Sequence, residues 1–267
     1  MIGKNKYGVN AHFCYIRTII FLIIVSFICT ASILFALDES EKKINEETLQ
    51  SLAFFHESLK YAYGKNLKVG DFAKYIMIDD AGPSSEVEVK VYKKEKGAFW
   101  ILDRSEYGEL HSLVNFPKMK LLKGYYLQDG KKDILPIVDD KDIPELYQKF
   151  KQWMRKSYSL LLPIAGYQFK KTTKIKEIKV PAGSFKCVCL EPQFSAEQTE
   201  GMMPEHIEMW KSRMRLCFSE EVPRLIPSPE MMMDVLVITD LDILEQVQGG
   251  LVKFGEYELI DYNKKRD

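Results

Sequence analysis

The cysteines are the clearest group of side chains in this sequence whose types and spacing suggest chemistry. Cys187 and Cys189 are separated by one residue, and Cys217 follows later in the chain. In an extended strand, such neighbours point to the same face and are badly placed to bridge each other. Two interpretations remain: a cross-strand bridge from one of them to Cys217, or a set of buried free thiols.

One tight acid–histidine group, Glu205-His206-Ile207-Glu208, places two carboxylates beside an imidazole. Such carboxylates can orient a histidine as a general base. No nucleophile or second metal ligand accompanies His206, however, and His56 and His111 are isolated in the sequence. The sequence also contains no H-E-x-x-H, no G-x-S-x-G and no glycine-rich phosphate loop. We therefore predict that the protein is not an enzyme and uses no metal or cofactor.

The first 37 residues predict an export segment. Ile16–Leu37 is apolar apart from Arg17 and small hydroxylated residues, and this run is long enough to cross a membrane as a helix. Basic residues precede it and acidic residues follow from Asp38, an order that predicts export of residues 38–267. Residues 1–37 fit both a cleaved signal peptide and an uncleaved signal anchor. We expect the protein in the periplasm or at the outer face of the cytoplasmic membrane, and in contact with that membrane if the segment is retained.

Charge and composition limit the partners and the number of domains. Residues 1–37 contain three of the 38 basic residues and none of the 38 acidic ones, so the remainder of the chain is mildly acidic. This balance argues against nucleic acid as a partner, because nucleic-acid binding requires a basic patch. No low-complexity tract or glycine- and serine-rich linker interrupts residues 38–267, which we expect to form a single exported domain.

The elements that would position these residues are mainly β-strands. Val87, Val89 and Val91 alternate with Glu86, Glu88 and Lys90, a pattern typical of an antiparallel strand with one buried face. The expected strands are Phe72–Ile78, Glu86–Tyr92, Ala98–Arg104, Glu109–Val114, Lys118–Leu127, Lys131–Ile137, Ile207–Phe218, Met231–Ile238 and Leu251–Tyr262.

A β-hairpin is expected around Val180-Pro181-Ala182-Gly183. Proline presets φ for a turn and glycine takes a left-handed conformation without strain, which predicts a three-residue loop with a glycine bulge. The incoming strand is expected to run from Tyr167 to Val180. On the outgoing strand, Phe185, Cys187 and Cys189 should share one face.

Two helices are expected, at Ser40–Tyr63 and Asp142–Leu162. The second combines an apolar stripe with a basic face, which fits either a membrane-surface helix or a helix packed on the sheet with its basic side in solvent. The proline-rich segment Val222–Pro229 should be irregular because proline removes ladder donors. Leu241–Gln248 is expected to be a short helix or a loop.

Four short motifs add a resemblance to this pattern: Gly70–Tyr75, Val180–Cys187, Phe218–Pro223 and Glu258–Tyr262. Their order resembles that of bacterial cell-envelope proteins of unknown function with a LolA/LolB-like half-barrel. The resemblance implies an α+β fold in which a single curved antiparallel sheet packs against helices. It also implies an apolar concave face, which holds acyl chains in the lipoprotein carriers of this fold.

On this basis Val87, Val89, Val91 and Phe185 are the candidate ligand-binding residues. We expect a non-enzymatic envelope protein that binds or carries a lipid, an acyl chain or another apolar ligand, with a lipoprotein as an implied partner. The alternative is an envelope protein-interaction or structural module without a small ligand. Both expectations make the concave face of the sheet the feature to examine.

Overall fold

The computed structural model describes residues 46–79, 82–159, 168–172, 174–227 and 230–263. The expected export segment, the start of the first expected helix and the end of the second lie outside the described residues. Among the described residues, no helix is both long enough and apolar enough to cross a membrane.

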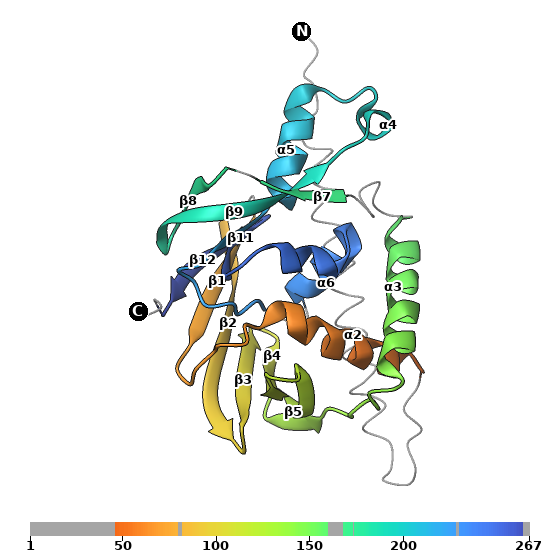
Figure 1. Ribbon diagram of the computed structural model, residues 1–267, viewed down its shortest axis with the longest axis vertical. Helices are drawn as coiled ribbons and strands as arrows, with labels where there is room; N and C mark the ends of the chain where they lie inside the picture. Colours follow the sequence, from red (N-terminus) through yellow and green to blue (C-terminus); the bar gives the residue numbers. More distant parts are fainter. Residues whose placement is uncertain (1–45, 80–81, 160–167, 173, 228–229, 264–267) are drawn as a thin grey trace.

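The fold is α+β, with twelve strands in one antiparallel sheet and the helices gathered mainly on one side of it (Figure 1). The strands are β1 (Phe72–Asp79), β2 (Gly82–Glu95), β3 (Ala98–Ser105), β4 (Gly108–Asn115), β5 (Lys120–Gln128), β6 (Lys131–Ile134), β7 (Gln168–Lys171), β8 (Lys176–Val180), β9 (Gly183–Gln193), β10 (Leu216–Ser219), β11 (Gly250–Phe254) and β12 (Tyr257–Tyr262). The helices are α2 (Glu46–Ala62), α3 (Ile143–Ser159), α4 (Ala196–Thr199), α5 (Pro204–Met214), α6 (Glu230–Ile238) and the 3-10 helix η1 (Leu241–Gln246).

The sheet is open, with the strand order β6-β5-β4-β3-β2-β1-β12-β11-β10-β9-β7, while β8 pairs with β9. Strands β1 to β6 form a meander, as the alternation of the sequence predicts. The last strand, β12, pairs with β1, for example at Tyr75 and Leu259, and so places the first and last described strands side by side. The Ala182 N–H at the hairpin tip donates to the Leu259 carbonyl at 3.1 Å, so the β8–β9 hairpin folds back toward β12.

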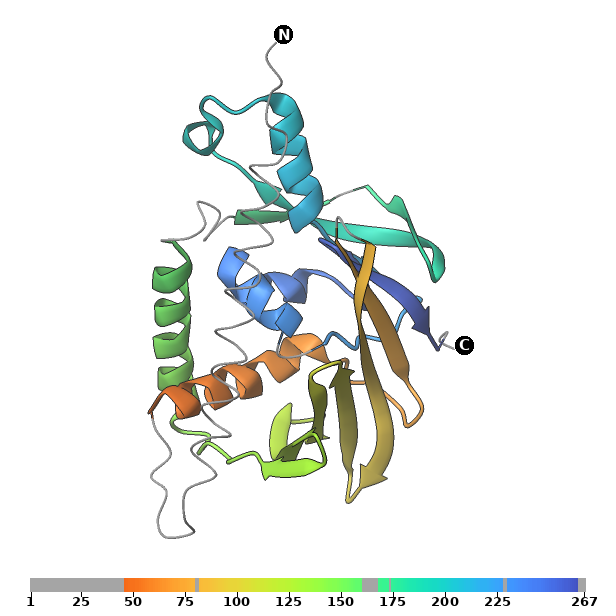
Figure 2. The same ribbon diagram turned by 180° about the vertical axis from the view of Figure 1, so that it is seen from behind.

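Helices α2 and α6 lie between the sheet and α3 (Figure 2). Their apolar side chains belong to one large core cluster, to which α2 contributes Phe54, Phe55 and Leu59, all at most 6% exposed. Burying a side chain of this size contributes about 1.5–3 kcal/mol. Two acids in the first turn of α2, Glu46 and Glu47, also suit the positive end of the helix dipole.

The proline-rich segment is irregular, as predicted, and it ties α2 to the rest of the core. The Arg224 guanidinium donates to the carbonyls of Tyr61 (2.7 Å), Val247 (2.9 Å) and Leu244 (3.0 Å). Burial lowers the pKa of Arg224 to about 10, which leaves the group charged at neutral pH. One partly buried cation thus accounts for carbonyls at the end of α2 and in and after η1.

Two expected strands are helical in the structure. Ile207–Met214 belongs to α5, and Met231–Ile238 belongs to α6; only Leu216–Phe218 of the first prediction is a strand. In α5, Pro204 occupies the first turn and Ile207, Trp210 and Met214 recur with helical spacing. A short apolar run such as Met231–Ile238 does not distinguish a strand from a buried helix, and packing on several sides decides for the helix here.

The hairpin also differs from its prediction in two ways. The incoming strand is not continuous but divides into β7 and β8. Between them, the Thr172 hydroxyl accepts a hydrogen bond from the Cys189 N–H at 3.0 Å, replacing a ladder acceptor. The turn contains two residues, since Val180 lies directly opposite Gly183, and Gly183 has the expected positive φ (137°).

Candidate functional site

The candidate residues of the inner face, which is the helix-covered face of the sheet, are closed off from solvent. Val87 and Phe185 are each 3% exposed, and Val89 and Val91 are 0% exposed. Val89, Val91 and Phe185 belong to the same core cluster. Phe185 packs against Tyr262 of β12, with ring centroids 5.5 Å apart, at the hairpin end of the sheet. The structure therefore joins three of the four candidates through the core and leaves none of the four at a surface.

The basic face of the α3 helix is paired with acids rather than left free. Lys151 and Arg155 both form ion pairs with Asp240, and Lys149 pairs with Glu46 at 3.0 Å. The helix packs against α2, where Phe150 stacks on Phe54 with centroids 5.0 Å apart. Of the two interpretations of this helix, its ion pairs and packing agree with a helix packed inside the domain, although on other helices rather than directly on the sheet.

The opposite, outer face of β2–β5 contains an organised group of aromatic side chains. We call Tyr92, Trp100, His111 and Tyr125 the outer aromatic cluster. His111 stacks on Tyr125 with centroids 4.4 Å apart and meets Tyr92 edge-on at 5.5 Å. Trp100 is 8% exposed and packs with Ala98 and Leu113 in a small hydrophobic cluster separate from the main core. In both overall views the helices lie on the other side of these strands (Figures 1 and 2).

Hydrogen bonds fix the imidazole within this cluster. The Tyr92 hydroxyl lies 3.0 Å from His111 Nδ1, and His111 Nε2 lies 3.1 Å from Glu109 Oε2. A neutral imidazole that accepts from Tyr92 and donates to Glu109 satisfies both contacts. Glu109 also accepts from Arg104 Nε at 2.8 Å. The pKa of Glu109 is lowered overall: burial raises it, but the hydrogen bonds from His111 and Arg104 outweigh that effect.

A second carboxylate fixes the tryptophan. Trp100 Nε1 donates to Glu95 at 2.9 Å, and Lys123 donates to the other oxygen of Glu95 at 3.1 Å. These hydrogen bonds, with that from Trp100 the larger cause, lower the pKa of Glu95 to about 2. The Lys123 ammonium also lies 5.3 Å from the Trp100 ring centroid. The cluster is therefore held in place by a rim of charged side chains.

The cluster presents aromatic rings with polar edges and a phenol that is held protonated. The hydrogen-bonded series from Glu109 through His111 ends on the Tyr92 phenol, whose pKa is raised by burial and by a hydrogen bond with Tyr125. A phenol that resists deprotonation is a poor nucleophile and a poor general base. Rigid aromatic rings with polar edges are, by contrast, the side chains that anchor binding surfaces.

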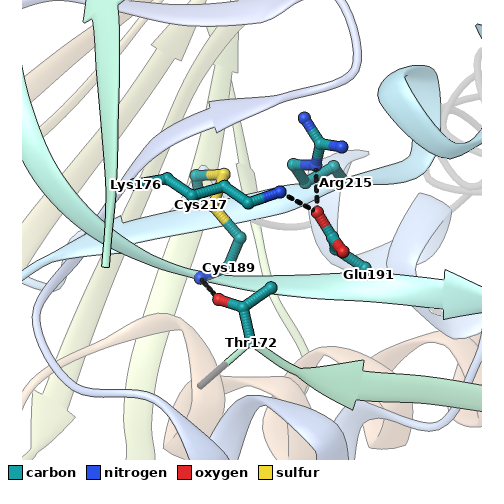
Figure 3. Close-up of a disulfide and its surroundings, with 6 residues drawn as sticks. All are labelled: Thr172, Lys176, Cys189, Glu191, Arg215 and Cys217. Carbon is teal, nitrogen blue, oxygen red and sulfur yellow. Dashed lines mark hydrogen bonds and ion pairs between the residues drawn. A yellow bond between two sulfur atoms is a disulfide. The ribbon is translucent and has the colours of Figure 1, made fainter. Parts of the chain in front are cut away.

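A disulfide joins Cys189 to Cys217, which are direct cross-strand partners in β9 and β10. Cys187 is a buried free thiol, and burial raises its pKa to about 12. Figure 3 shows Lys176 and Arg215 converging on Glu191 beside the bridge, with Arg215 Nε 2.8 Å from the carboxylate. The disulfide and the ion pairs beside it therefore connect elements of the fold, and the described cysteines offer no accessible reactive thiolate.

The other sequence candidates do not form a site. His206 is exposed on α5, in a helix rather than in the loop-to-strand entry that was expected. No group of three or more potential metal-ligating side chains occurs in the part of the chain that the structure describes. Sequence reasoning missed the outer aromatic cluster, and one signal was available: the alternation that places Val91 inside places Tyr92 on the polar side of the same strand.

Comparison with protein-family models, with curated proteins and with solved structures finds no match to this chain.

Proposed function

We propose that this protein is an exported, non-enzymatic envelope module that binds another envelope protein through the outer face of β2–β5. The observation that carries the proposal is the contrast in side-chain hydrogen bonding between the two faces. The inner face is closed, apolar core, whereas the outer face contains aromatic rings held by hydrogen bonds to partly exposed polar and charged side chains. The proposal includes the LolA/LolB-like half-barrel architecture that the sequence motifs suggest.

The disulfide supports the export component of this proposal. Bridges such as Cys189–Cys217 persist in oxidising compartments and are rare in the cytosol. The order of basic, apolar and acidic residues at the N-terminus predicts the same direction of transport. An alkaline phosphatase fusion at the C-terminus should be active, and activity of a cytoplasmic reporter there would contradict export.

Site-specific photocrosslinking in the native cell tests the binding surface. A benzophenone side chain at Lys93, an exposed position paired with Trp100 across β2 and β3, should give one discrete protein adduct. The same group at Met203, exposed on the loop before α5, is the matched control and should give none. Lys123→Glu should abolish the Lys93 adduct, because it reverses the charge beside Glu95 and Trp100. Equal adducts from both positions would contradict the proposal.

Carriage of an apolar ligand is the second candidate function, and the position of α3 favours it. Displacing α3 would break the ion pairs to Asp240 and Glu46 and uncover Phe150 and Met154 without breaking a strand ladder. An acyl chain would then gain about 0.8 kcal/mol for each methylene it buries.

Ligand titration separates the two candidates. If α3 acts as a lid, Asp240→Asn should increase palmitate-competed binding of an apolar fluorophore, whereas Glu145→Gln, which removes only a contact within α3, should not. If the protein instead binds another protein, as we propose, neither variant should show saturable binding of the fluorophore. Lipid that co-purifies in stoichiometric amount in native mass spectrometry would favour the carrier instead.

A further inference from the structure

We infer that the open edge of β6 accepts an extended segment of a partner polypeptide in which an acidic side chain follows an apolar one with one residue between them. The inference rests on the proposed function and deepens it, because this edge continues the outer face that contains the aromatic cluster. Three features carry it: the direction of the backbone groups of β6, the side chains that end at the edge, and their charge.

The backbone of β6 leaves hydrogen-bonding groups unused by its neighbour. In the described chain β6 pairs only with β5, across the turn Asp129-Gly130, whose residues have φ of 50° and 75°. Positive φ at both positions defines a type I′ hairpin, in which alternate residues bond across the pair. The Leu135 N–H continues this alternation by donating to the Gly124 carbonyl at 3.0 Å. The N–H and C=O groups of Lys132 and Ile134 therefore point away from β5.

Two rows of side chains cross the outer face and end at these two residues. The first row contains the directly paired residues Leu102, His111, Tyr125 and Ile134. The second contains Glu88, Arg104, Glu109, Leu127 and Lys132. An added strand would place one side chain beside Ile134, which is 61% exposed, and one beside Lys132.

The chemistry of the rows defines those two side chains. The first row is apolar or aromatic up to the edge, so an apolar residue continues it. The charged side chains of the second row alternate in sign from Glu88 through Arg104 to Glu109 and then, beyond the uncharged Leu127, to Lys132. The Lys132 ammonium lies 3.9 Å from the Tyr125 ring centroid, and no carboxylate among the described residues forms an ion pair with it. An acid opposite Lys132 completes the alternation.

Register then fixes the order of the two residues, and charge argues against a second copy of this chain. An antiparallel segment that places its apolar residue opposite Ile134 places a residue two positions later opposite Lys132. Two copies paired through β6 about Asp133 would set the Asp133 residues against each other and Lys132 against Ile134. Like charges directly opposite destabilise a sheet, so the edge disfavours self-pairing.

The test uses the full chain and the labelled peptide Thr-Thr-Val-Thr-Glu-Thr-Thr, with fluorescence anisotropy as the readout. We expect saturable binding, weakened at least tenfold when lysine replaces the peptide's glutamate. Lys132→Glu should weaken binding of the glutamate peptide equally and restore binding of the lysine peptide. Hydrogen exchange should show that the glutamate peptide protects the Lys132 and Ile134 amides. Equal binding of both peptides, or no binding by the folded chain, overturns the inference.

A proline substitution tests the backbone hydrogen bonds of the β6 edge separately from its side-chain contacts. Ile134→Pro removes an N–H that points away from β5, so the ladder to β5 remains and peptide binding should be lost. Ile134→Thr keeps the N–H and should retain most of the binding, and thermal melting confirms that both variants fold. If peptide binding fails while the Lys93 adduct persists, the edge inference falls and the proposed function stands. If the adduct is also absent, both fall.

Discussion

The two faces of β2 and β3 use the same strands for opposite purposes. On the inner face, Val89, Val91 and Ile101 are at most 1% exposed and contribute only apolar surface. On the outer face, Tyr92 and Trp100 are also largely covered, but each makes a hydrogen bond through its polar edge. Burial alone therefore does not separate core from site in this protein. The two faces of these strands are distinguished instead by hydrogen bonds between side chains, which occur on the face away from the helices.

The largest test of this comparison substitutes adjacent residues of one strand. Val89→Asp places an unpaired carboxylate in the closed inner face and should cost more than about 4 kcal/mol, enough to prevent folding. Lys90→Asp changes the neighbouring outer position and should change the unfolding free energy by less than about 0.5 kcal/mol. Chemical denaturation measures both variants. Similar losses would show that the faces do not differ.

The next effect concerns the inner-face disulfide. Replacing both Cys189 and Cys217 by alanine should cost about 3–4 kcal/mol, the value expected for a loop of this length. Cys187→Ala is the matched control on the same strand face and keeps the bridge. Its cost should be only about 1 kcal/mol, since it removes one buried sulfur atom. Denaturation of the oxidised proteins gives the comparison, and equal costs would contradict a stabilising bridge.

Two tyrosine hydroxyls sharpen the comparison further. Tyr75→Phe leaves the buried Leu225 carbonyl without the hydroxyl that donates to it at 2.8 Å and should cost about 1–3 kcal/mol. Tyr92→Phe removes the outer hydrogen bond to His111, in a partly exposed position, and should cost about 1 kcal/mol. Thermal unfolding of the two variants should preserve this order. A larger loss for Tyr92→Phe would make the outer cluster the stronger structural element.

The smallest expected effect is the pH dependence of the stability that Glu109 of the outer face contributes. Because the folded-state pKa of Glu109 is lowered, its ionised form stabilises the fold fully above the ordinary value of 4.5. That contribution is lost as the pH falls through the lowered pKa. The melting temperature of the wild type should therefore drop more between pH 6 and pH 3 than that of Glu109→Gln. If the melting temperatures of the two proteins fall in parallel, Glu109 does not stabilise the fold through these contacts.

Sequence alone predicts the inner face better than the outer one. Alternation in Glu86–Tyr92 indicates which side chains are buried, because residues two apart in a strand share a face. The outer cluster depends on which residue of β4 lies beside which residue of β5, and a single sequence does not determine that register. His111 is isolated in the chain and meets Tyr125 only through strand pairing.

Secondary structure was also predicted incorrectly in short segments. Met231–Ile238 is a helix because its neighbours in the fold cover it on sides that a strand would leave open, whereas the helix over Ile207–Met214 agrees with Pro204 in its first turn and with the helical spacing of its apolar residues. The break between β7 and β8 likewise depends on the Thr172 hydroxyl, which replaces a backbone acceptor for Cys189. The helix at Met231–Ile238 and the break between β7 and β8 do not follow from local propensity, because tertiary packing overrides propensity over such short lengths.

The disulfide has one further consequence for the segment that it encloses. Cys189 and Cys217 bracket the excursion that contains α4 and α5, so the two strands at its base are linked both by the sheet and by a covalent bond. A protease that cuts the exposed loop at Met202–Met203 would therefore leave two fragments that remain one molecule until the bridge is reduced. The segment between Cys189 and Cys217 is therefore a suitable place for an inserted tag or a cleavage site, because the disulfide holds the chain together on either side of it.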